Sequence, residues 1–235
     1  MLRFVAAIVV LFGVQALPAA QQKSPAVGIG PEPASTPVSW EFDFKYLEPR
    51  RIEVKLAGSD QPEVFWYMVY TVTNTGRTTQ HFYPTFTLVT EELRVIETDM
   101  GISPLVFQAI RERHKVTHPY LVHPTKAIGE LRSGDDYACE SVAIWRATDV
   151  NVTNFTIYVA GLSGEARVLR NPAYDPDKPE TRKIADENGR EQEVTINPKY
   201  FTLRKTLQLQ YLLPASDKAR RQIEPRLQDA GWIMR

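Results

Sequence analysis

Three histidines close together in the chain are the clearest candidates for metal chemistry. His114, His118 and His123 lie in the segment HKVTHPYLVH. On a helix, His114 and His118 would lie one turn apart on the same side, and two imidazoles so placed can share a metal ion. However, Pro119 directly follows His118 and disfavours helical backbone there, and no glutamate completes the two-histidine motif of zinc proteases. The pattern favours histidines in a solvated connecting loop, with a metal site at His114 and His118 as the alternative.

An acidic segment further along the chain offers oxygen ligands. Asp175, Asp177 and Glu180 lie in DPDKPE, with Asp186 and Asn188 close behind. Oxygen ligands at alternating positions can bind calcium, but this segment lacks the glycine and the spacing of an EF-hand loop. A solvated acidic loop stiffened by proline is therefore the favoured interpretation.

The sequence gives little support for a catalytic serine or cysteine nucleophile. Ser163, in Gly161-Leu-Ser163-Gly164, lacks the final glycine spacing of a nucleophile elbow. Cys139 is the single cysteine, and nothing in the sequence brings a histidine beside it. We interpret Cys139 as a small core hydrophobe, with pairing between chains as the alternative. The sequence predicts no catalytic residue, no cofactor and no enzyme activity.

Aromatic residues give a second binding hypothesis. Trp66, Tyr67, Tyr83 and Tyr120 could stack on sugar rings if several of them face solvent on one sheet. Aromatic residues that recur with period two are also typical of a buried sheet face, and that interpretation is favoured.

Composition limits the classes of partner. The chain has 235 residues, of which 43% are hydrophobic, and its 28 basic residues balance its 28 acidic ones. A neutral chain has no electrostatic footprint for nucleic acid, so we expect no nucleic-acid partner. One cysteine excludes an intrachain disulfide framework and any site that needs several cysteines.

The N-terminal segment predicts export. In residues 1–20, Arg3 precedes an apolar run over residues 4–14, and small residues follow at Ala16, Ala19 and Ala20. This order is typical of a signal peptide, and the run is shorter than the roughly 20 residues that span a bilayer. We expect a periplasmic or extracellular protein with no transmembrane segment after cleavage, the alternative being an uncleaved anchor. Residues 21–38, rich in proline, predict an extended linker.

Residues 39–235 are predicted to form one β-sandwich domain. Trp40, Phe42, Phe44 and Tyr46 alternate with polar residues, which is typical of a strand with one buried face. A run over residues 64–72 is apolar on both parities and predicts a central strand, followed by a turn at Asn74-Thr-Gly76. Further strands are predicted over residues 52–56, 82–89, 93–96, 137–145, 152–160 and 200–212, the last interrupted by Lys205.

Helices and an insertion interrupt the strands. Ser103-Pro104 predicts the start of a short inserted helix, and Ser216-Asp217 that of a C-terminal helix that Pro225 should break or kink. Residues 170–198 form a polar insertion with a hairpin signal at Asn188-Gly189. The apolar tail, residues 231–235, is expected to dock on the sandwich.

Several segments resemble exported immunoglobulin-like modules. Tyr70-Thr-Val-Thr-Asn74-Thr-Gly76 resembles their strand and asparagine-containing turn, and residues 131–134 followed by 142–145 resemble a later turn and strand. Asn154-Phe-Thr-Ile-Tyr-Val-Ala-Gly161-Leu resembles a penultimate central strand. The resemblance covers residues 40–165 and extends to bacterial exported proteins. It implies a mainly β, antiparallel immunoglobulin-like sandwich and brings no catalytic residues with it, and the cysteine pair and core tryptophan of antibody domains are missing from their expected arrangement.

These observations together predict an exported, non-enzymatic structural or protein-interaction module. Its partner would be a protein of the envelope or exterior, recruited by addition of a strand to an exposed sheet edge. The alternative is a module that binds carbohydrate or another ligand.

Overall fold

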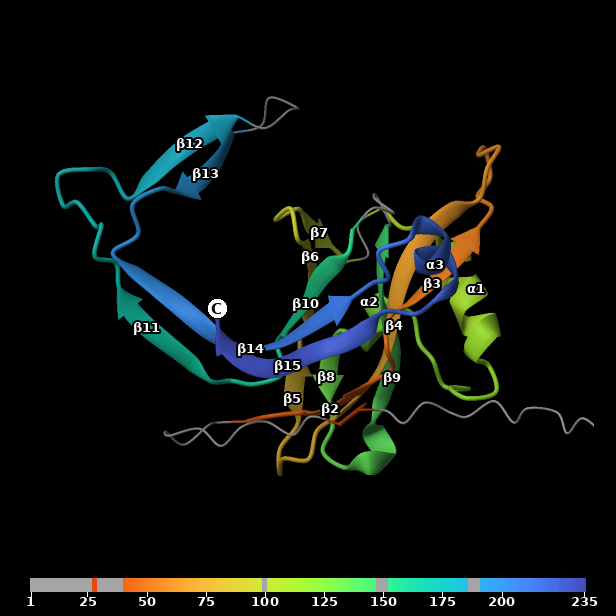
Figure 1. Ribbon diagram of the computed structural model, residues 1–235. Coiled ribbons are helices and arrows are strands. Elements are labelled where there is room, and N and C mark those ends of the chain that lie inside the picture. The colour runs from red at the N-terminus through yellow and green to blue at the C-terminus, as the bar shows by residue number, and fades with distance from the viewer. Residues whose placement is uncertain (1–26, 29–39, 99–100, 147–151, 186–190) are drawn as a thin grey trace, which may run out of the picture.

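A computed structural model describes residues 27–28, 40–98, 101–146, 152–185 and 191–235 (Figure 1). Antiparallel strands dominate it, which confirms the mainly β prediction. The predicted signal peptide lies outside the described residues, as does most of the predicted linker. Within that linker, however, β1 (Val27–Gly28) pairs with β2 (Asp43–Tyr46), so this part belongs to the first sheet.

The first sheet is built around β4 (Glu63–Thr73). One edge of β4 pairs with β2 and with β3 (Arg50–Val54), and β9 (Cys139–Arg146) pairs along the other. Because β4 is apolar on both parities, it can be covered on both faces, and it is buried over most of its length as the sequence predicts. Its C-terminal turn is held by Asn74, whose side chain accepts from the Gly76 N–H and donates to the Leu131 carbonyl.

The second sheet is built around β14 (Tyr200–Leu212), the longest strand described. Along one edge of β14 lie β10 (Asn154–Ala160) and then β11 (Ala166–Arg170), and along the other lies β15 (Arg226–Met234). Beyond β10 come β6 (Thr85–Thr90) and β7 (Val95–Glu97). The apolar tail therefore docks as expected, in the form of strand β15.

Smaller elements complete the fold. β5 (Gln80–Phe82) pairs with β8 (Gly129–Leu131), and β12 (Thr181–Ala185) pairs with β13 (Glu191–Thr195). The second pair is the predicted hairpin, whose Asn188-Gly189 turn lies outside the described residues. The helices are α1 (Pro104–His114), capped by Ser103 as predicted, α2 (Pro124–Ala127), the 3-10 turn η1 (Asp135–Tyr137) and α3 (Asp217–Gln222). Among the described residues, no helix has the length and apolar character needed to cross a membrane.

The core lies between the two sheets. Phe44, Tyr70 and Trp145 from the first sheet pack with Ile157 and Leu209 from the second in one buried cluster, an arrangement compatible with a β-sandwich. Helix α1 covers the opposite face of the first sheet, where a second cluster forms. That cluster joins the helix to strands β3, β4 and β9 through Val106, Ile110, Ile52, Phe65, Val69 and Ile144.

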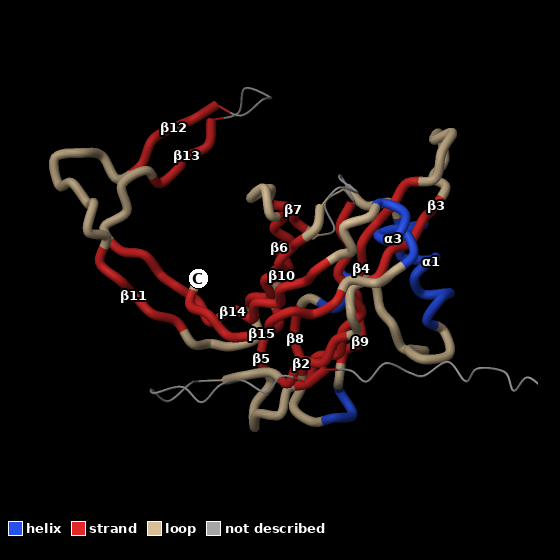
Figure 2. Tube along the Cα trace, in the orientation of Figure 1, coloured by secondary structure: helices blue, strands red, loops and turns tan. Residues whose placement is uncertain are grey.

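Strand β14 extends beyond this core. On its inner face Tyr211, Leu209 and Leu207 are buried, but Phe201, further back along the same face, is 43% exposed. Here β14 pairs with β11 as a two-stranded ribbon, which leads into the loop at residues 171–180 and the β12–β13 hairpin (Figures 1 and 2). We call the described residues of this segment, 166–185 and 191–204, the arm.

Lys205 marks the point where β14 leaves the core. Its side chain is 5% exposed, and its ammonium group lies 2.9 Å from a Glu41 carboxylate oxygen and 3.2 Å from one of Glu165. The ammonium also lies 5.3 Å from the centre of the Trp232 ring. Burial by itself lowers the pKa of Lys205, but the two carboxylates outweigh it and the net pKa is raised. Lys205 interrupts the apolar face of β14 in the sequence. In the structure it is a paired cation at the end of the core.

Gly161 lies between β10 and β11, where the second sheet turns into the arm. Its φ of +83° belongs to the left-handed region, which glycine adopts without steric cost. A Cβ here would collide with the backbone carbonyl oxygen of Tyr83 and lie 3.1 Å from Cα of Pro84. Gly161 is therefore required both by its backbone angle and by the closeness of the neighbouring chain.

We predict that Gly161→Ala lowers the free energy of unfolding by about 2–4 kcal/mol, because backbone strain adds to a collision with backbone atoms. Gly58→Ala is the matched control: Gly58 has a φ of +84°, but no heavy atom lies within 4 Å of its added Cβ. It should cost about 1 kcal/mol from strain alone. Urea unfolding measures both changes, and equal losses in the two variants would contradict the proposed collision.

We predict that Lys205→Met destabilises the chain by about 2–4 kcal/mol at neutral pH, because two largely buried carboxylates lose their cation. Adding Glu41→Gln and Glu165→Gln to the same chain should recover part of that loss. Denaturant midpoints at constant slope test both statements. A Lys205→Met variant as stable as the parent would show that the ion pairs do not close the core.

Candidate functional site

The three histidines do not lie together in a solvated loop, so that expectation is wrong for His114. His114 is the last residue of α1 and is only 4% exposed. The His118 ring lies 5.7 Å from it, centre to centre, whereas His123 caps α2 and its ring packs against Phe107. Among the residues that the structure describes, no group of three histidine, cysteine, aspartate or glutamate side chains is placed to hold a metal ion.

His114 takes part in a hydrogen-bonded contact between α1 and the first sheet. Its Nε2 lies 3.1 Å from the hydroxyl oxygen of Tyr67, and that oxygen accepts a hydrogen bond from Arg113 at 3.2 Å. Because arginine only donates, the Tyr67 proton is free to point at Nε2, which then must be an unprotonated acceptor. Burial, with the positive charges of His118, Arg50 and Arg113, lowers the pKa of His114 to about 4, and burial raises the pKa of Tyr67. This geometry gives His114 a structural role as a neutral acceptor.

We predict that the free energy of unfolding falls by about 2 kcal/mol from pH 7 to pH 5 through His114 alone. Its folded pKa of about 4 lies below the histidine reference of 6.5, so the unfolded chain takes up a proton that the folded chain does not. This stability is present above pH 6.5 and is lost as the pH falls toward 4.

The measurement is urea unfolding at both pH values for the parent chain, His114→Gln and the control His81→Gln, which replaces an exposed histidine. His114→Gln should lose this part of the pH dependence, and His81→Gln should keep it. The same pH dependence in all three proteins would contradict the assignment to His114.

The four candidate aromatic residues do not form a solvent-facing row. Tyr67 is buried, and Trp66 is partly buried with its ring 5.6 Å from that of Phe155. Tyr83 and Tyr120 are exposed, but Tyr83 lies between β5 and β6 and Tyr120 between α1 and α2. Trp66 and Tyr67 therefore belong to the packed interior, as the favoured interpretation expects.

The remaining candidates serve local structure. Cys139 begins β9 and is partly buried against the core, and burial raises the pKa of its thiol. The Ser163 hydroxyl is buried and accepts from the Glu165 N–H. In the acidic segment, Asp175 accepts from the Asp177 N–H and forms an ion pair with Lys178. Asp186 and Asn188 lie outside the described residues.

Two asparagines fix the loop of the arm. Asn171 donates to the Pro198 carbonyl and accepts from the Ala173 N–H. Asn197 accepts from the Asp175 N–H and donates to the carbonyls of Asp175 and Lys178. Both side chains are buried in an otherwise exposed segment, so they hold the two ends of the insertion together. The repeated Asn-Pro pair, 171–172 and 197–198, is the sequence signal that marks this structure.

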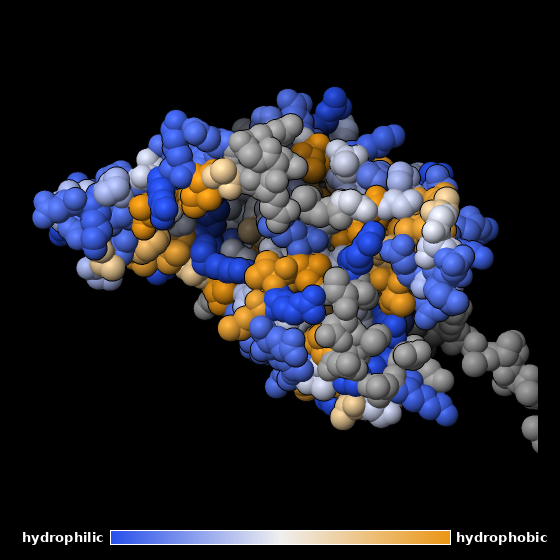
Figure 3. Space-filling model, turned by 90° about the horizontal axis from the view of Figure 1, so that it is seen from above, coloured by the Kyte–Doolittle hydropathy of each residue, from blue (hydrophilic) through white to orange (hydrophobic). Residues whose placement is uncertain are grey.

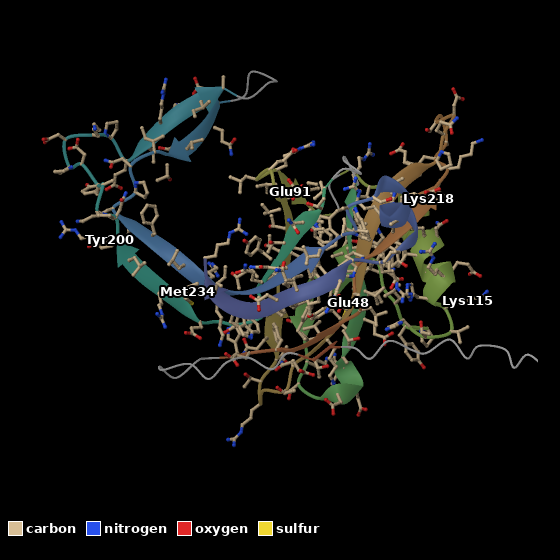
Figure 4. All side chains as sticks on the ribbon, in the orientation of Figure 1. Glu48, Glu91, Lys115, Tyr200, Lys218 and Met234 are labelled. Carbon is tan, nitrogen blue, oxygen red and sulfur yellow. The ribbon has the colours of Figure 1, made fainter. Side chains whose placement is uncertain are left out.

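The ribbon of the arm combines exposed apolar residues with positive charge. Residues 166–170 and 199–204 carry Arg167, Arg170, Lys199 and Arg204 and no acidic residue. Seen from above in Figure 3, the arm projects from the body and carries apolar surface between hydrophilic side chains. In Figure 4 the labelled Tyr200 lies at the far end of β14, away from Glu48 and Lys218. The exposed apolar residues of the arm are Val168, Leu169, Ile184, Ile196, Tyr200 and Phe201.

The chain matches no protein-family model, no curated protein and no solved structure.

Proposed function

We propose that the chain is an exported, non-enzymatic protein-interaction module with an immunoglobulin-like sandwich, which contacts a partner protein through the arm. The site of action is the periplasm or the cell exterior. The observation that carries the proposal is the arm itself, which exposes apolar residues on a segment that projects from the body.

The contacts of the arm support a role in recognition. Phe201 and Leu169 lie opposite each other in the register, and both remain exposed although their face of β14 continues the inner face of the core. Exposed apolar surface rimmed by charge is typical of interaction sites. Since Asn171 and Asn197 order the loop before any partner arrives, binding would lose little conformational entropy there.

Export is supported by the sequence alone, through the charged, apolar and small-residue order of residues 1–20. The sugar-binding alternative rested on a row of rings that Trp66, Tyr67, Tyr83 and Tyr120 do not form.

We predict that a photo-crosslinking benzoylphenylalanine at Leu169, in the full chain expressed in its native host, captures one discrete protein partner in the envelope or exterior fraction. The control position is Val116, which is exposed on the loop after α1. It should give no such adduct.

The same adducts at both positions would contradict the role of the arm. Adducts confined to the cytosol, with an N-terminus that starts at Met1, would contradict export. A turnover activity that survives removal of contaminating enzymes would contradict the non-enzymatic assignment.

A further inference from the structure

The outer edge of β11 has backbone groups free to pair with another strand. The Lys205 N–H donates to the Glu165 carbonyl, and the Asn171 N–H donates to the Lys199 carbonyl. In an antiparallel pair the bonding residues alternate, so Arg167 and Leu169 also direct their backbone groups toward β14. Ala166, Val168 and Arg170 then direct theirs outward, and no described residue bonds to them there.

The positive side chains of the ribbon limit which strands can pair with the outer edge of β11. Among the described residues, Arg167, Arg170 and Arg204 have no carboxylate within ion-pair distance, and Lys199 lies over the ring of Tyr200. Two copies pairing through β11 would bring these cations together without any acid between them. Charged residues on an edge strand discourage such self-association. The edge therefore suits an acidic strand from another protein.

The register gives the recognition pattern. Arg167 and Arg170 enclose Val168 and Leu169, and residues directly opposite each other across two strands share a face. A strand paired with β11 would place acidic residues opposite the two arginines and apolar residues opposite the two between them. Leu169 and Phe201, neighbours across β11 and β14, extend the apolar surface on one face.

We infer that the outer edge of β11 accepts a strand with the pattern acidic–apolar–apolar–acidic from a partner protein. The inference rests on the proposed function and names the partner segment. The pattern reads the same in both directions, so it holds for parallel and antiparallel addition. Backbone bonds would supply affinity, and the two arginines would supply specificity.

The test uses the purified full chain and short capped peptides with the core Glu-Val-Val-Glu, with the scrambled core Val-Glu-Glu-Val, or with the charge-reversed core Lys-Val-Val-Lys. Calorimetry at low salt should show binding of the first peptide, about fivefold to tenfold weaker binding of the second, and none of the third. Added salt should weaken the binding.

Two proline variants separate edge pairing from simple charge attraction. Val168→Pro removes an outward N–H and leaves the β11–β14 hydrogen bonds in place, so it should weaken binding at least about tenfold. Thr202→Pro is the matched control, because Thr202 lies opposite Val168 and directs its N–H to the other edge of the ribbon. It should bind like the parent, and circular dichroism checks that both variants fold.

Three outcomes would overturn the inference: no preference for Glu-Val-Val-Glu over the scrambled peptide, equal effects of the two prolines, or self-association of the chain that Val168→Pro abolishes. Heparin or polyglutamate binding that Val168→Pro does not weaken would instead assign the cations to a polyanion.

If the Leu169 adduct persists while the peptides fail, only this inference falls. If the peptides bind but no adduct forms, the proposed function falls.

Discussion

Strand β14 is longer than the first sheet can cover, and this mismatch determines the rest of the structure. Its inner face is buried as far as Lys205 and continues into Leu203, which is partly buried, and Phe201, which is exposed. A buried ammonium group is costly unless it is paired, and Glu41 and Glu165 approach it from the rim of each sheet. The paired lysine and carboxylates end the core, where an apolar residue would have continued it.

The arm beyond this point needs its own source of order. A two-stranded ribbon is marginally stable in water, since it buries little apolar area against the entropy of fixing its backbone. Here the ribbon continues the sheet through β14, and two buried asparagines tie the ends of its loop. The apolar residues left exposed on it add nothing to the core. Exposed apolar side chains on an ordered, basic ribbon are typical of a binding surface.

Much of the fold could be predicted from the sequence, because local patterns of apolar, capping and turn residues mark its elements. The buried run of β4, the Ser103 cap of α1 and the docking of the tail follow from local pattern. The arm could not be predicted that way. The face that carries Phe201 and Leu203 reads as core, and only the length of the opposing sheet decides that Phe201 is exposed. The burial of His114 could not be predicted for a related reason, because it depends on Tyr67, which lies on a strand 47 residues away in the chain.

The proposed role of the arm requires β11 to be an ordered strand with one edge bonded to β14 and the other edge open. Amide hydrogen exchange, followed by NMR, tests it most directly. The account predicts slow exchange for the amides of Arg167 and Leu169, and fast exchange for those of Ala166, Val168 and Arg170. Uniformly fast exchange across these five residues would show that the ribbon does not form, and uniformly slow exchange would show that its outer edge is already paired.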